Sequence, residues 1–466
     1  MERVLPKTLD YTDVLPLAVE SRARRRTFFP INGQKFASNG ANIIRIDLSA
    51  DALLDTQHSY LRFKFSPKER NCGIDTAGGH SFIRRLRVEQ SGTVLEDINS
   101  YNRLMGAIVL PCQSTNEHRG ERSITEGITT IGQSTGVGAN ENTAYMPSSV
   151  YTGGAVGADQ IVGGIHNKND QISGDTSSYE FCIPLNSGIL NNDKLIPLML
   201  MSAPLTIEIE LAPSLQPVCW DTAAGFYEIE NVRYIANLIE VGQDVAQQLR
   251  MVQEVSGGVL TLAGQTYRHF TGALTDGSGD QIINVPARVK SMKSLFFVGQ
   301  GAGSDGFASY DVSCGTNLRM VEYQLKIGSV VYPPTPVACQ FGDGSDASIF
   351  NKRSEPLMEL AKSWGSVGST KGMGQLNSMT YATSSGNQSR GTSNQKIFYS
   401  PFGLDLEAFQ RVAIESGVNT ADRSLPISLI IQTNANPGNG NQNVDVFVLA
   451  DALFYINGDG SMSVSV

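Results

Sequence analysis

Apolar and polar residues alternate with the period of a β-strand in many short segments of this chain. Clear examples are residues 43–48 (IIRIDL), 60–65 (YLRFKF), 82–88 (FIRRLRV) and 205–211 (LTIEIEL). A period of two places one side of a strand toward a core and the other toward solvent. Turns rich in Gly, Pro and Asn separate these segments, so the pattern predicts many short antiparallel strands.

The strand pattern occurs twice, about half a chain apart. A strand, turn and strand around Gly92 match those around Gly328, an offset of 328 − 92 = 236 residues. An alternating segment around Ala236 matches one around Ala450, an offset of 450 − 236 = 214 residues. Both offsets are close to half of the 466 residues, a length greater than one hydrophobic core usually serves. The sequence therefore predicts two copies of one β unit.

Helical spacing is confined to a few segments. Residues 242–258 carry valine and leucine on one helical face, followed by glycines, and predict a helix that connects the halves. Two further helices are predicted at residues 96–109 and 405–416. The polar, Gly-rich stretches 126–178 and 365–393 are longer than ordinary loops. They are either recognition loops on a β scaffold or flexible surface, and composition does not separate the two.

Residues 322–338 (EYQLKIGSVVYPPTPVA) combine a strand with a proline-rich continuation. The strand is expected to reverse at Gly328 and Ser329. The returning strand then meets Pro333, Pro334 and Pro336. Proline has no N–H to donate to a ladder, so we expect this strand to pair briefly and then leave the sheet.

Composition supports the all-β prediction and narrows the partners. The chain has 47 Gly, 19 Pro and only 17% charged residues, which is typical of strands joined by tight turns. A net charge of −9 argues against nucleic-acid binding by the chain as a whole. The one concentrated positive run contains Arg22, Arg24, Arg25 and Arg26. These arginines predict an arm that contacts nucleic acid, an acidic partner or lipid head groups; the alternative is a solvated arm with local ion pairs to Glu20 and Asp13.

Cysteine spacing and the N-terminus indicate the compartment of synthesis. The six cysteines are Cys72, Cys112, Cys182, Cys219, Cys314 and Cys339, and no two form a C-x-x-C pair. We expect buried, reduced thiols rather than a disulfide framework or a zinc site. The N-terminus has no apolar signal core, and the chain has no run of about 18 apolar residues. We therefore expect a soluble protein made inside the cell.

Catalytic motifs are present only as fragments. Residues 132–136 match G-x-S-x-G, but a nucleophile elbow needs a helix after the serine and VGANENTAY cannot begin one. Residues 298–306 lead into another strand-like run, and residues 365–372 lack the adjacent Gly-Lys of a phosphate loop. The histidines, His58, His80, His118, His166 and His269, are isolated from one another in the sequence. We predict no catalytic, cofactor or metal site.

One stretch resembles a known family. Residues 181–213 (FCIPLNSGILNNDKLIPLMLMSAPLTIEIELAP) are similar to a segment of double jelly-roll major capsid proteins, in which Ile-Pro-Leu leads through a loop to Leu-Ile-Pro-Leu and a strand. The resemblance extends to residues 78–104, 323–337 and 402–431, in the same order along both halves. It is strongest to capsid proteins of polinton-like viruses and virophages, within the lineage that includes adenovirus hexon.

The resemblance implies an all-β chain with two eight-stranded antiparallel jelly rolls in tandem and a few short inserted helices. The expected parts are an N-terminal arm at residues 1–26, a first jelly roll at 27–241, a helical connector at 242–256 and a second jelly roll at 257–466. The prolines near residue 333 would then keep a jelly-roll strand from offering an open edge.

The resemblance also implies a function without catalysis. The expected protein is the major capsid protein of a DNA virus, a pseudo-hexameric homotrimer that tiles an icosahedral shell. Expected partners are neighbouring capsomers, penton proteins, and minor capsid or cement proteins. The basic arm would face inward toward the genome or an inner membrane, with no cofactor and no small-molecule substrate. The expected location is the virion, assembled inside the host cell.

Two other classes stay open at the level of sequence. A glycan-binding or adhesive β-sandwich, such as a viral spike or lectin, could use Trp220 and Trp364 to stack on sugars, although both tryptophans fit a core equally well. Such a protein needs no internal duplication. A jelly-roll enzyme is the third class, and the scattered histidines count against it.

Overall fold

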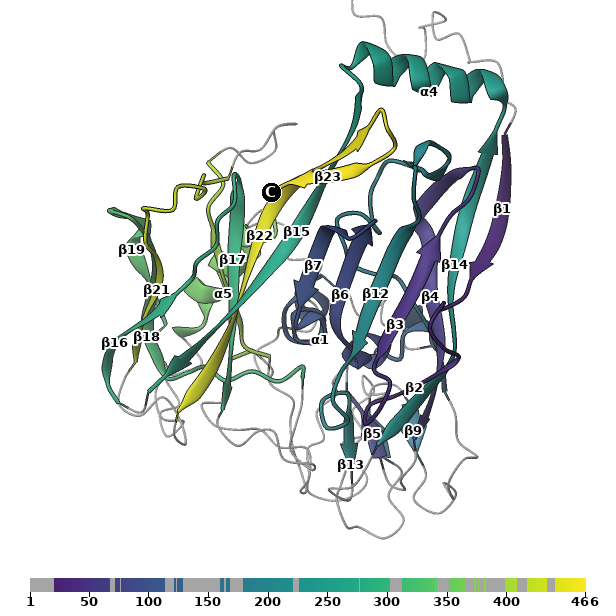
Figure 1. Cartoon of the computed structure of the whole chain (residues 1–466). Helices are drawn as coiled ribbons and strands as arrows, with labels where there is room; N and C mark the ends of the chain where they lie inside the picture. The colour runs from purple at the N-terminus through teal and green to yellow at the C-terminus, as the bar shows by residue number, and fades with distance from the viewer. Residues whose placement is uncertain are drawn as a thin grey trace, which may run out of the picture.

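The computed structural model describes residues 21–67, 72–75, 77–113, 121–122, 124–128, 160–162, 165–167, 179–220, 226–275, 277–301, 312–339, 341, 352–365, 373, 376, 381–382, 399–408, 417–433 and 441–466. Strands dominate these residues, and the ladders between the main strands are antiparallel. The strands are ordered into facing sheets, two in each half of the chain (Figure 1).

The first half contains two sheets. One has the order β1-β14-β4-β10, with β2 pairing to β14 and β11 to β4, and the other has the order β3-β12-β6-β7. The strands of the first sheet are β1 (Ser21–Phe28), β2 (Lys35–Ala37), β4 (Leu53–Pro67), β10 (Tyr179–Ile183), β11 (Ile196–Pro197) and β14 (Tyr227–Val241). Those of the second are β3 (Ile43–Leu48), β6 (Ile83–Gln90), β7 (Thr93–Asn99) and β12 (Leu205–Leu211).

The second half repeats this arrangement. One sheet has the order β15-β22-β17-β20, with β23 pairing to β22, and the other has the order β16-β21-β18-β19. The first contains β15 (Val259–Leu274), β17 (Met292–Gly301), β20 (Pro401–Asp405), β22 (Gln442–Asn457) and β23 (Met462–Ser465). The second contains β16 (Gly279–Asn284), β18 (Met320–Ile327), β19 (Val330–Ala338) and β21 (Ile427–Thr433). Two small ladders pair β5 (Cys72–Ile74) with β13 (Val218–Trp220), and β8 (Gln160–Val162) with β9 (Ile165–Asn167).

The topology confirms the predicted fold class. In the first half the eight main strands in chain order are β1, β3, β4, β6, β7, β10, β12 and β14, and in the second half they are β15 to β22. Numbered one to eight, they form sheets of order 1-8-3-6 and 2-7-4-5 in both halves. This is the connectivity of a jelly roll. The chain therefore consists of two eight-stranded antiparallel jelly rolls, hereafter the first and second rolls.

Each roll buries a core between its two sheets. The alternation of β12, with Leu205, Ile207 and Ile209 buried, turns one side of that strand inward. An aromatic cluster fills the first core: the rings of Phe65 and Phe82 lie 4.9 Å apart, and Phe63 and Phe181 lie against them. Ring pairs of this kind add about 0.5–1.5 kcal/mol each beyond the area they bury. In the second core Phe297, Tyr323 and Phe402 form the corresponding cluster.

The predicted helices have three different outcomes. The connecting helix is confirmed as α4 (Gln243–Val255), which joins β14 to β15. The helix predicted at 96–109 starts too early, because residues up to Asn99 pair with β6, and the helical segment begins at Tyr101. It comprises α1 (Tyr101–Arg103), the π-helix η3 (Leu104–Val109) and α2 (Leu110–Gln113). The helix predicted at 405–416 is wrong at its start, since Asp405 ends β20, and residues 409–416 lie outside the described residues.

Some short helical elements were not predicted. Among them are the helix α5 (Ser354–Ser363) and two 3-10 turns, η2 (Gly78–Phe82) and η5 (Leu198–Leu200). None of the helices in the described part of the chain is long and apolar enough to span a bilayer.

The proline-rich strand β19 differs from the prediction. It turns from β18 at Gly328 and Ser329 as expected, but it returns to the ladder, where Val337 pairs with Tyr323. A register shift between Tyr323 and Leu325 accommodates the prolines, and the Gln324 side chain donates to the Pro333 carbonyl oxygen at 2.7 Å. Because β19 pairs only with β18, its missing N–H groups cost no ladder bond on the outer side.

The predicted boundary at residue 26 is wrong. Strand β1 begins at Ser21 and pairs with β14 along its whole length, from Ser21 opposite Val241 to Phe28 opposite Tyr234. Residues 21–26 therefore belong to the first sheet of the first roll and cannot form a free arm. Residues 1–20, the rest of the predicted arm, lie outside the described residues.

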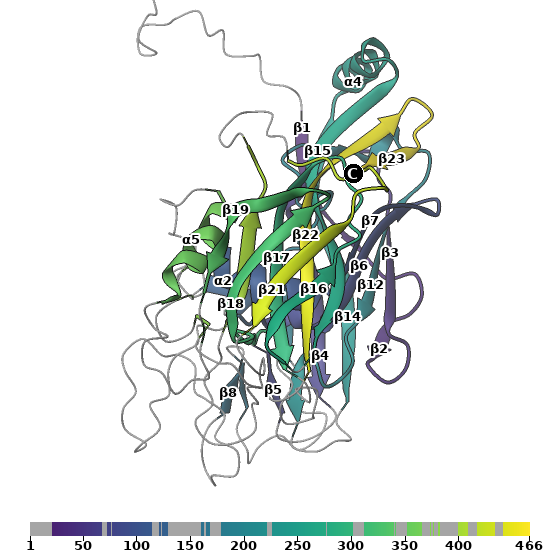
Figure 2. The same cartoon turned by 90° about the vertical axis from the view of Figure 1, so that its left-hand side faces the viewer.

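Both rolls point the same way. The last residues of β4 and β7 and the first residue of β10 lie at one end of the first roll, where Pro67 pairs with Tyr227 and Tyr179 with Phe65. In the second roll Gly301, which ends β17, pairs with Gln442 at the corresponding end. The helix α4 lies at the opposite end, above the first roll, and leads into β15 of the second roll (Figures 1 and 2). The longest connections of both rolls thus leave from one end of the molecule.

Candidate functional site

The two rolls meet along a buried contact, hereafter the seam. From the first roll it is formed by β7, the helical segment after it and the connection between β10 and β12; from the second roll it is formed by β15, β17 and β22. No strand of one roll pairs with a strand of the other among the described residues. The seam is therefore held mainly by side chains, together with a backbone hydrogen bond from the Ser202 N–H to the Gly460 carbonyl oxygen at 3.0 Å.

Arg103 is the centre of the seam. It lies in α1 of the first roll, and its side chain is only 4% exposed. Its Nε lies 3.2 Å from Oδ2 of Asp445 on β22. Its terminal nitrogens donate to the carbonyl oxygens of Val312 at 2.6 Å, Gly299 at 3.1 Å and Cys314. A guanidinium is suited to this position because it presents five N–H donors in a fixed plane.

Asp445 receives a second partner within its own roll. His269 on β15 lies with Nε2 at 2.9 Å from Oδ1 of Asp445. Burial alone would raise the pKa of Asp445, but the hydrogen bond from His269 and the charge of Arg103 outweigh it and hold that pKa below its ordinary value. The carboxylate is therefore stabilised in its charged form between the two rolls.

Glu96 on β7 is a second buried carboxyl group at the seam, and it is 3% exposed. It accepts hydrogen bonds from the Ser187 hydroxyl, from the backbone N–H of Gly188 at 3.0 Å, and from the Thr266 hydroxyl of the second roll. Burial raises the pKa of Glu96 above its ordinary value, although these hydrogen bonds oppose the shift. Glu96 thereby orders the connection after β10 and presents it to β15.

Close backbone approach completes this part of the seam. A Cβ atom at Gly188 would stand 2.5 Å from the carbonyl oxygen of Gln265, so only glycine allows the two chains to pack this closely. Nearby, Asn192 Nδ2 donates to the Ala263 carbonyl oxygen at 2.9 Å. The first roll thus contacts β15 at Ala263 and Gln265.

A third contact ties the far end of the seam. The Gln90 side chain at the end of β6 donates to the Gly460 carbonyl oxygen at 3.1 Å and accepts from the Met462 backbone N–H at 2.6 Å. Gln90 also donates to Ala203 within its own roll. Together with Arg103, this contact fixes the two rolls at separated points and opposes rotation of one against the other.

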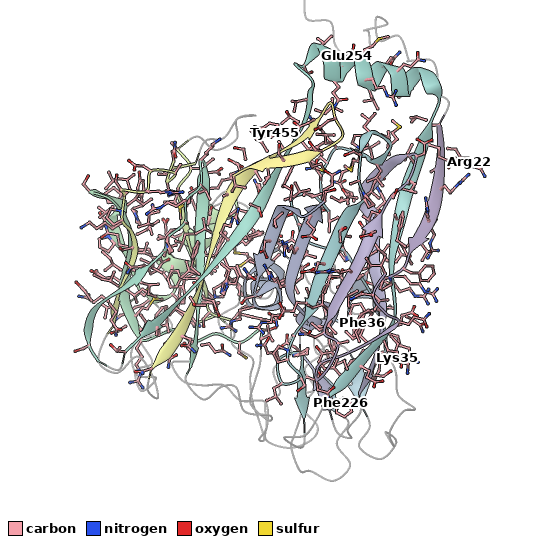
Figure 3. The ribbon with its side chains drawn as sticks, in the orientation of Figure 1. Arg22, Lys35, Phe36, Phe226, Glu254 and Tyr455 are labelled. Atoms are coloured by element: carbon pink, nitrogen blue, oxygen red, sulfur yellow. The ribbon has the colours of Figure 1, made fainter. Side chains whose placement is uncertain are left out.

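The arginines singled out by sequence lie on a different surface. Arg22, Arg24, Arg25 and Arg26 are all exposed on β1, an edge strand that pairs only with β14. Figure 3 shows Arg22 projecting away from the body of the first roll.

Three of these arginines have local partners. Arg24 forms an ion pair with Glu240 at 3.0 Å, and Arg25 donates to the Tyr60 hydroxyl at 3.2 Å. The guanidinium of Arg26 lies 4.9 Å from the centre of the Phe28 ring. Exposed contacts of this kind contribute little to stability, so a strand edge carrying four positive charges is left available on the surface.

The other motifs do not assemble into a catalytic site within the described residues. His80 is buried against Glu126 at 2.8 Å, and His58 is exposed beside Asp55. Among the residues that the structure describes, no three His, Cys, Asp or Glu side chains come together as metal ligands. Residues 132–136, 302–306 and 366–372 lie outside the described residues. Cys112 and Cys339 are buried thiols, as expected, whereas Cys182 and Cys314 are only half-buried, and the side chains of Cys72 and Cys219 are not described.

Sequence reasoning missed the residues of the seam. Glu96 gave a weak signal in the sequence, because this charged residue directly follows Leu95 in a strand. The structure buries both side chains. Arg103, Gly188 and Asp445 gave none, since their partners are distant in the sequence.

The fold, but not the sequence, matches known proteins. No family model and no curated protein sequence matches the chain. Among solved structures, a PBCV-1 virus capsid model superposes with a TM-score of 0.57 at 10% identity, covering 98% of this chain and 99% of that one. The Faustovirus major capsid protein gives 0.56 at 8% identity, covering 94% and 91%. The mavirus major capsid protein gives 0.52 at 9% identity, covering 99% and 95%. Over nearly its whole length, this chain therefore has the double jelly-roll fold of the viral major capsid proteins that it resembles.

Proposed function

We propose that this chain is a viral major capsid protein that assembles as a homotrimer, a pseudo-hexameric capsomer of an icosahedral shell. The observation that supports this most directly is the pair of complete jelly rolls that point the same way and are fixed by the seam. Two similar rolls in one chain allow three chains to present six nearly equivalent sides, while each side keeps contacts of its own.

The character of the seam fits a structural role. Its charged groups, Arg103 with Asp445 and Glu96 with Thr266, are used to join the rolls. A rigid two-roll block is what a shell needs, because neighbouring blocks must meet at reproducible angles. We therefore place the protein in the virion, with neighbouring capsomers as its main partners and with penton, minor capsid or cement proteins at special positions.

Contact of the β1 arginines with a genome or an inner membrane stays a prediction, but not as a free arm. A strand that is paired along its whole length cannot extend as an arm, so contact with a genome or an inner membrane would be made by its side chains alone. Binding of the purified protein to DNA or to anionic vesicles, measured at increasing salt, tests this role, because a contact of this kind weakens steeply with salt.

The oligomeric state and shape of the purified protein test the main proposal. We expect a mass about three times 50.2 kDa in sedimentation at micromolar concentration, and particles of pseudo-hexagonal outline with a three-fold axis in negative stain. A stable monomer at that concentration would contradict the proposal. Glycan binding by a protein that forms neither trimers nor cages would favour an adhesive β-sandwich instead.

A further inference from the structure

The first strands of the two rolls, β1 and β15, are equivalent residue by residue. Each is an edge strand that pairs with the eighth strand of its roll, β14 or β22. Arg26 pairs with Ala236, and Thr266 pairs with Ala450. Both alanines are fully buried, and beside each of them the ladder to the third strand shifts register. Residues 22–26 of β1 therefore correspond to residues 262–266 of β15.

These equivalent segments have opposite surroundings. In the second roll the first roll contacts this segment, through Asn192 at Ala263, Gly188 at Gln265 and Glu96 at Thr266, and Thr266 is buried while Ala263 and Gln265 stay exposed. In the first roll residues 21–26 are exposed on both sides of the strand. The position that the seam fills on one roll is thus open on the other.

The fifth strands, β7 and β19, complete the comparison. Each follows a tight turn with a left-handed glycine, Gly92 or Gly328, and each is the edge of its sheet. Glu96 pairs with Val88, which lies two residues before Gln90, the last paired residue of β6 in this hairpin. Tyr332 pairs with Leu325, which likewise lies two residues before Ile327, the last paired residue of β18. Strand β7 packs against β15 inside the chain. The corresponding edge β19 is open, with Val330 51% exposed.

We propose that β19 of one chain packs against β1 of a second copy of the same chain and repeats, between molecules, the contact that β7 makes with β15 within one molecule. This inference rests on the proposed trimer and specifies its interface. The contact is heterologous, joining the second roll of one chain to the first roll of the next. The six rolls of three chains form a closed ring if the junction between chains turns by the same angle as the seam. Such a ring contains three junctions within chains and three between chains.

The chemistry of the two edges is complementary. Arginine side chains only donate hydrogen bonds, and β1 carries four of them. Pro333, Pro334 and Pro336 of β19 have no N–H, so at these positions the edge presents acceptors without donors; the Pro333 and Pro334 carbonyl oxygens accept from Gln324 and each keeps a second lone pair. The seam already uses this combination, since Arg103 donates to three backbone carbonyl groups.

Tyr332 adds a specific pairing. Because it is equivalent to Glu96, it is expected to lie opposite Arg26 of the neighbouring chain, as Glu96 lies opposite Thr266 in the seam. A half-buried tyrosine ring is a favourable surface for a guanidinium group. A carboxyl group at the seam and an aromatic ring at the outer junction would let the two junctions be similar in shape and different in specificity.

Cysteine cross-linking tests the contact directly. Arg26→Cys and Tyr332→Cys are introduced together in a Cys182→Ser background, because Cys182 lies close to Arg25. After mild oxidation of the purified trimer, we expect most chains to run as covalent dimers and trimers on a non-reducing gel and to return to monomers with reductant. The matched internal pair, Glu96→Cys with Thr266→Cys, should lose its free thiols without any increase in mass.

Controls separate the inference from the proposed function. Arg26→Cys combined with Asp280→Cys, an exposed residue of β16, should give no ladder. If the wild type is a trimer and the Arg26/Tyr332 pair stays monomeric on the gel while the internal pair oxidises, the proposed contact is wrong and the trimer stands. A monomeric wild type would overturn both.

Charge reversal gives an independent readout. Arg22→Glu with Arg26→Glu should convert the trimer to monomer at micromolar concentration and leave the melting temperature of the monomer unchanged, since both side chains are exposed. The same double change at Arg84 and Lys290, which are exposed away from β1 and β19, should leave the trimer intact. A β1 variant that still forms trimers but no longer binds DNA or anionic vesicles would assign the arginines to the shell interior and overturn the inference.

Discussion

Replacing Arg103 by methionine should weaken the seam more than any exposed substitution. The change keeps an apolar stem of similar length, but it leaves the Asp445 carboxylate buried without its cation. It also leaves the carbonyl oxygens of Gly299, Val312 and Cys314 without this donor. Removing one partner of a buried ion pair lowers the free energy of unfolding by about 3–5 kcal/mol. A buried carbonyl oxygen left without a hydrogen-bond donor adds roughly 1 kcal/mol or more to this loss. We expect a total loss of at least about 4 kcal/mol in the free energy of unfolding.

Thermal unfolding measures this loss. For a cooperative unit of 150–250 residues, about 1 kcal/mol corresponds to a shift of about 2–4 °C in melting temperature. Arg103→Met should therefore melt about 8–16 °C below the wild type. Combining it with Asp445→Asn should recover part of the loss, because the uncompensated buried charge is then removed.

A matched surface change provides the control. Arg84 lies 3.6 Å from Glu210, and its side chain is 53% exposed. Arg84→Met should cost less than about 1 kcal/mol, the usual limit for an exposed ion pair. If Arg103→Met melts within the range of Arg84→Met, the argument that the guanidinium joins the two rolls is refuted.

Three other measurements probe the same seam. The lowered pKa of Asp445 means that its contribution is present above about pH 4 and is lost as the pH falls through the folded pKa, so Asp445→Asn should lose less stability than the wild type on acidification from about pH 5 to 3. Glu96 has the opposite sign: its pKa is raised, so its contribution is present below about pH 4 and is lost as the pH rises through the folded pKa. Urea titrations at about pH 5 and pH 8 should show a smaller difference for Glu96→Gln than for the wild type, and equal differences would count against this assignment. Gly188→Ala should lower the free energy of unfolding by about 1–3 kcal/mol, because its Cβ would meet the Gln265 oxygen at 2.5 Å. Gly40→Ala, whose Cβ would have its nearest neighbour at 3.9 Å, should change that free energy by less than about 0.5 kcal/mol. Equal denaturation midpoints for the two variants would show that the seam can widen.

The doubled β architecture could be predicted from sequence because strand alternation and turns are local properties. The match between Ala236 and Ala450 identified truly equivalent positions, since both are buried in the eighth strand of a roll beside a register shift. Helix α4 was also predictable, because its apolar spacing and the glycines after it are local.

The seam could not be predicted in the same way. Arg103 and Asp445 are 342 residues apart, and neither departs from what an exposed helix or strand would carry. Gly188 looks like an ordinary loop glycine until Gln265 is placed beside it. Tertiary contacts of this kind depend on how two finished rolls approach each other, which no local pattern encodes.

Strands β1 and β19 show how pairing partners override local sequence. The arginines of β1 lack the apolar alternation of a strand, yet Ser21 to Phe28 pair with β14, which supplies the ladder. The prolines of β19 predict departure from the sheet, yet Val337 rejoins β18 beyond a register shift. In both strands one side is free of ladder bonds, and there the usual sequence rules for a strand apply least.

The common direction of the two rolls makes this protein a natural display scaffold. The connections after β4 and β17 leave from the end opposite α4, away from Gln90. Peptides inserted into the middle of those connections would leave the strand register of both rolls unchanged. Engineered peptides from both rolls would therefore be carried at the same end of the molecule.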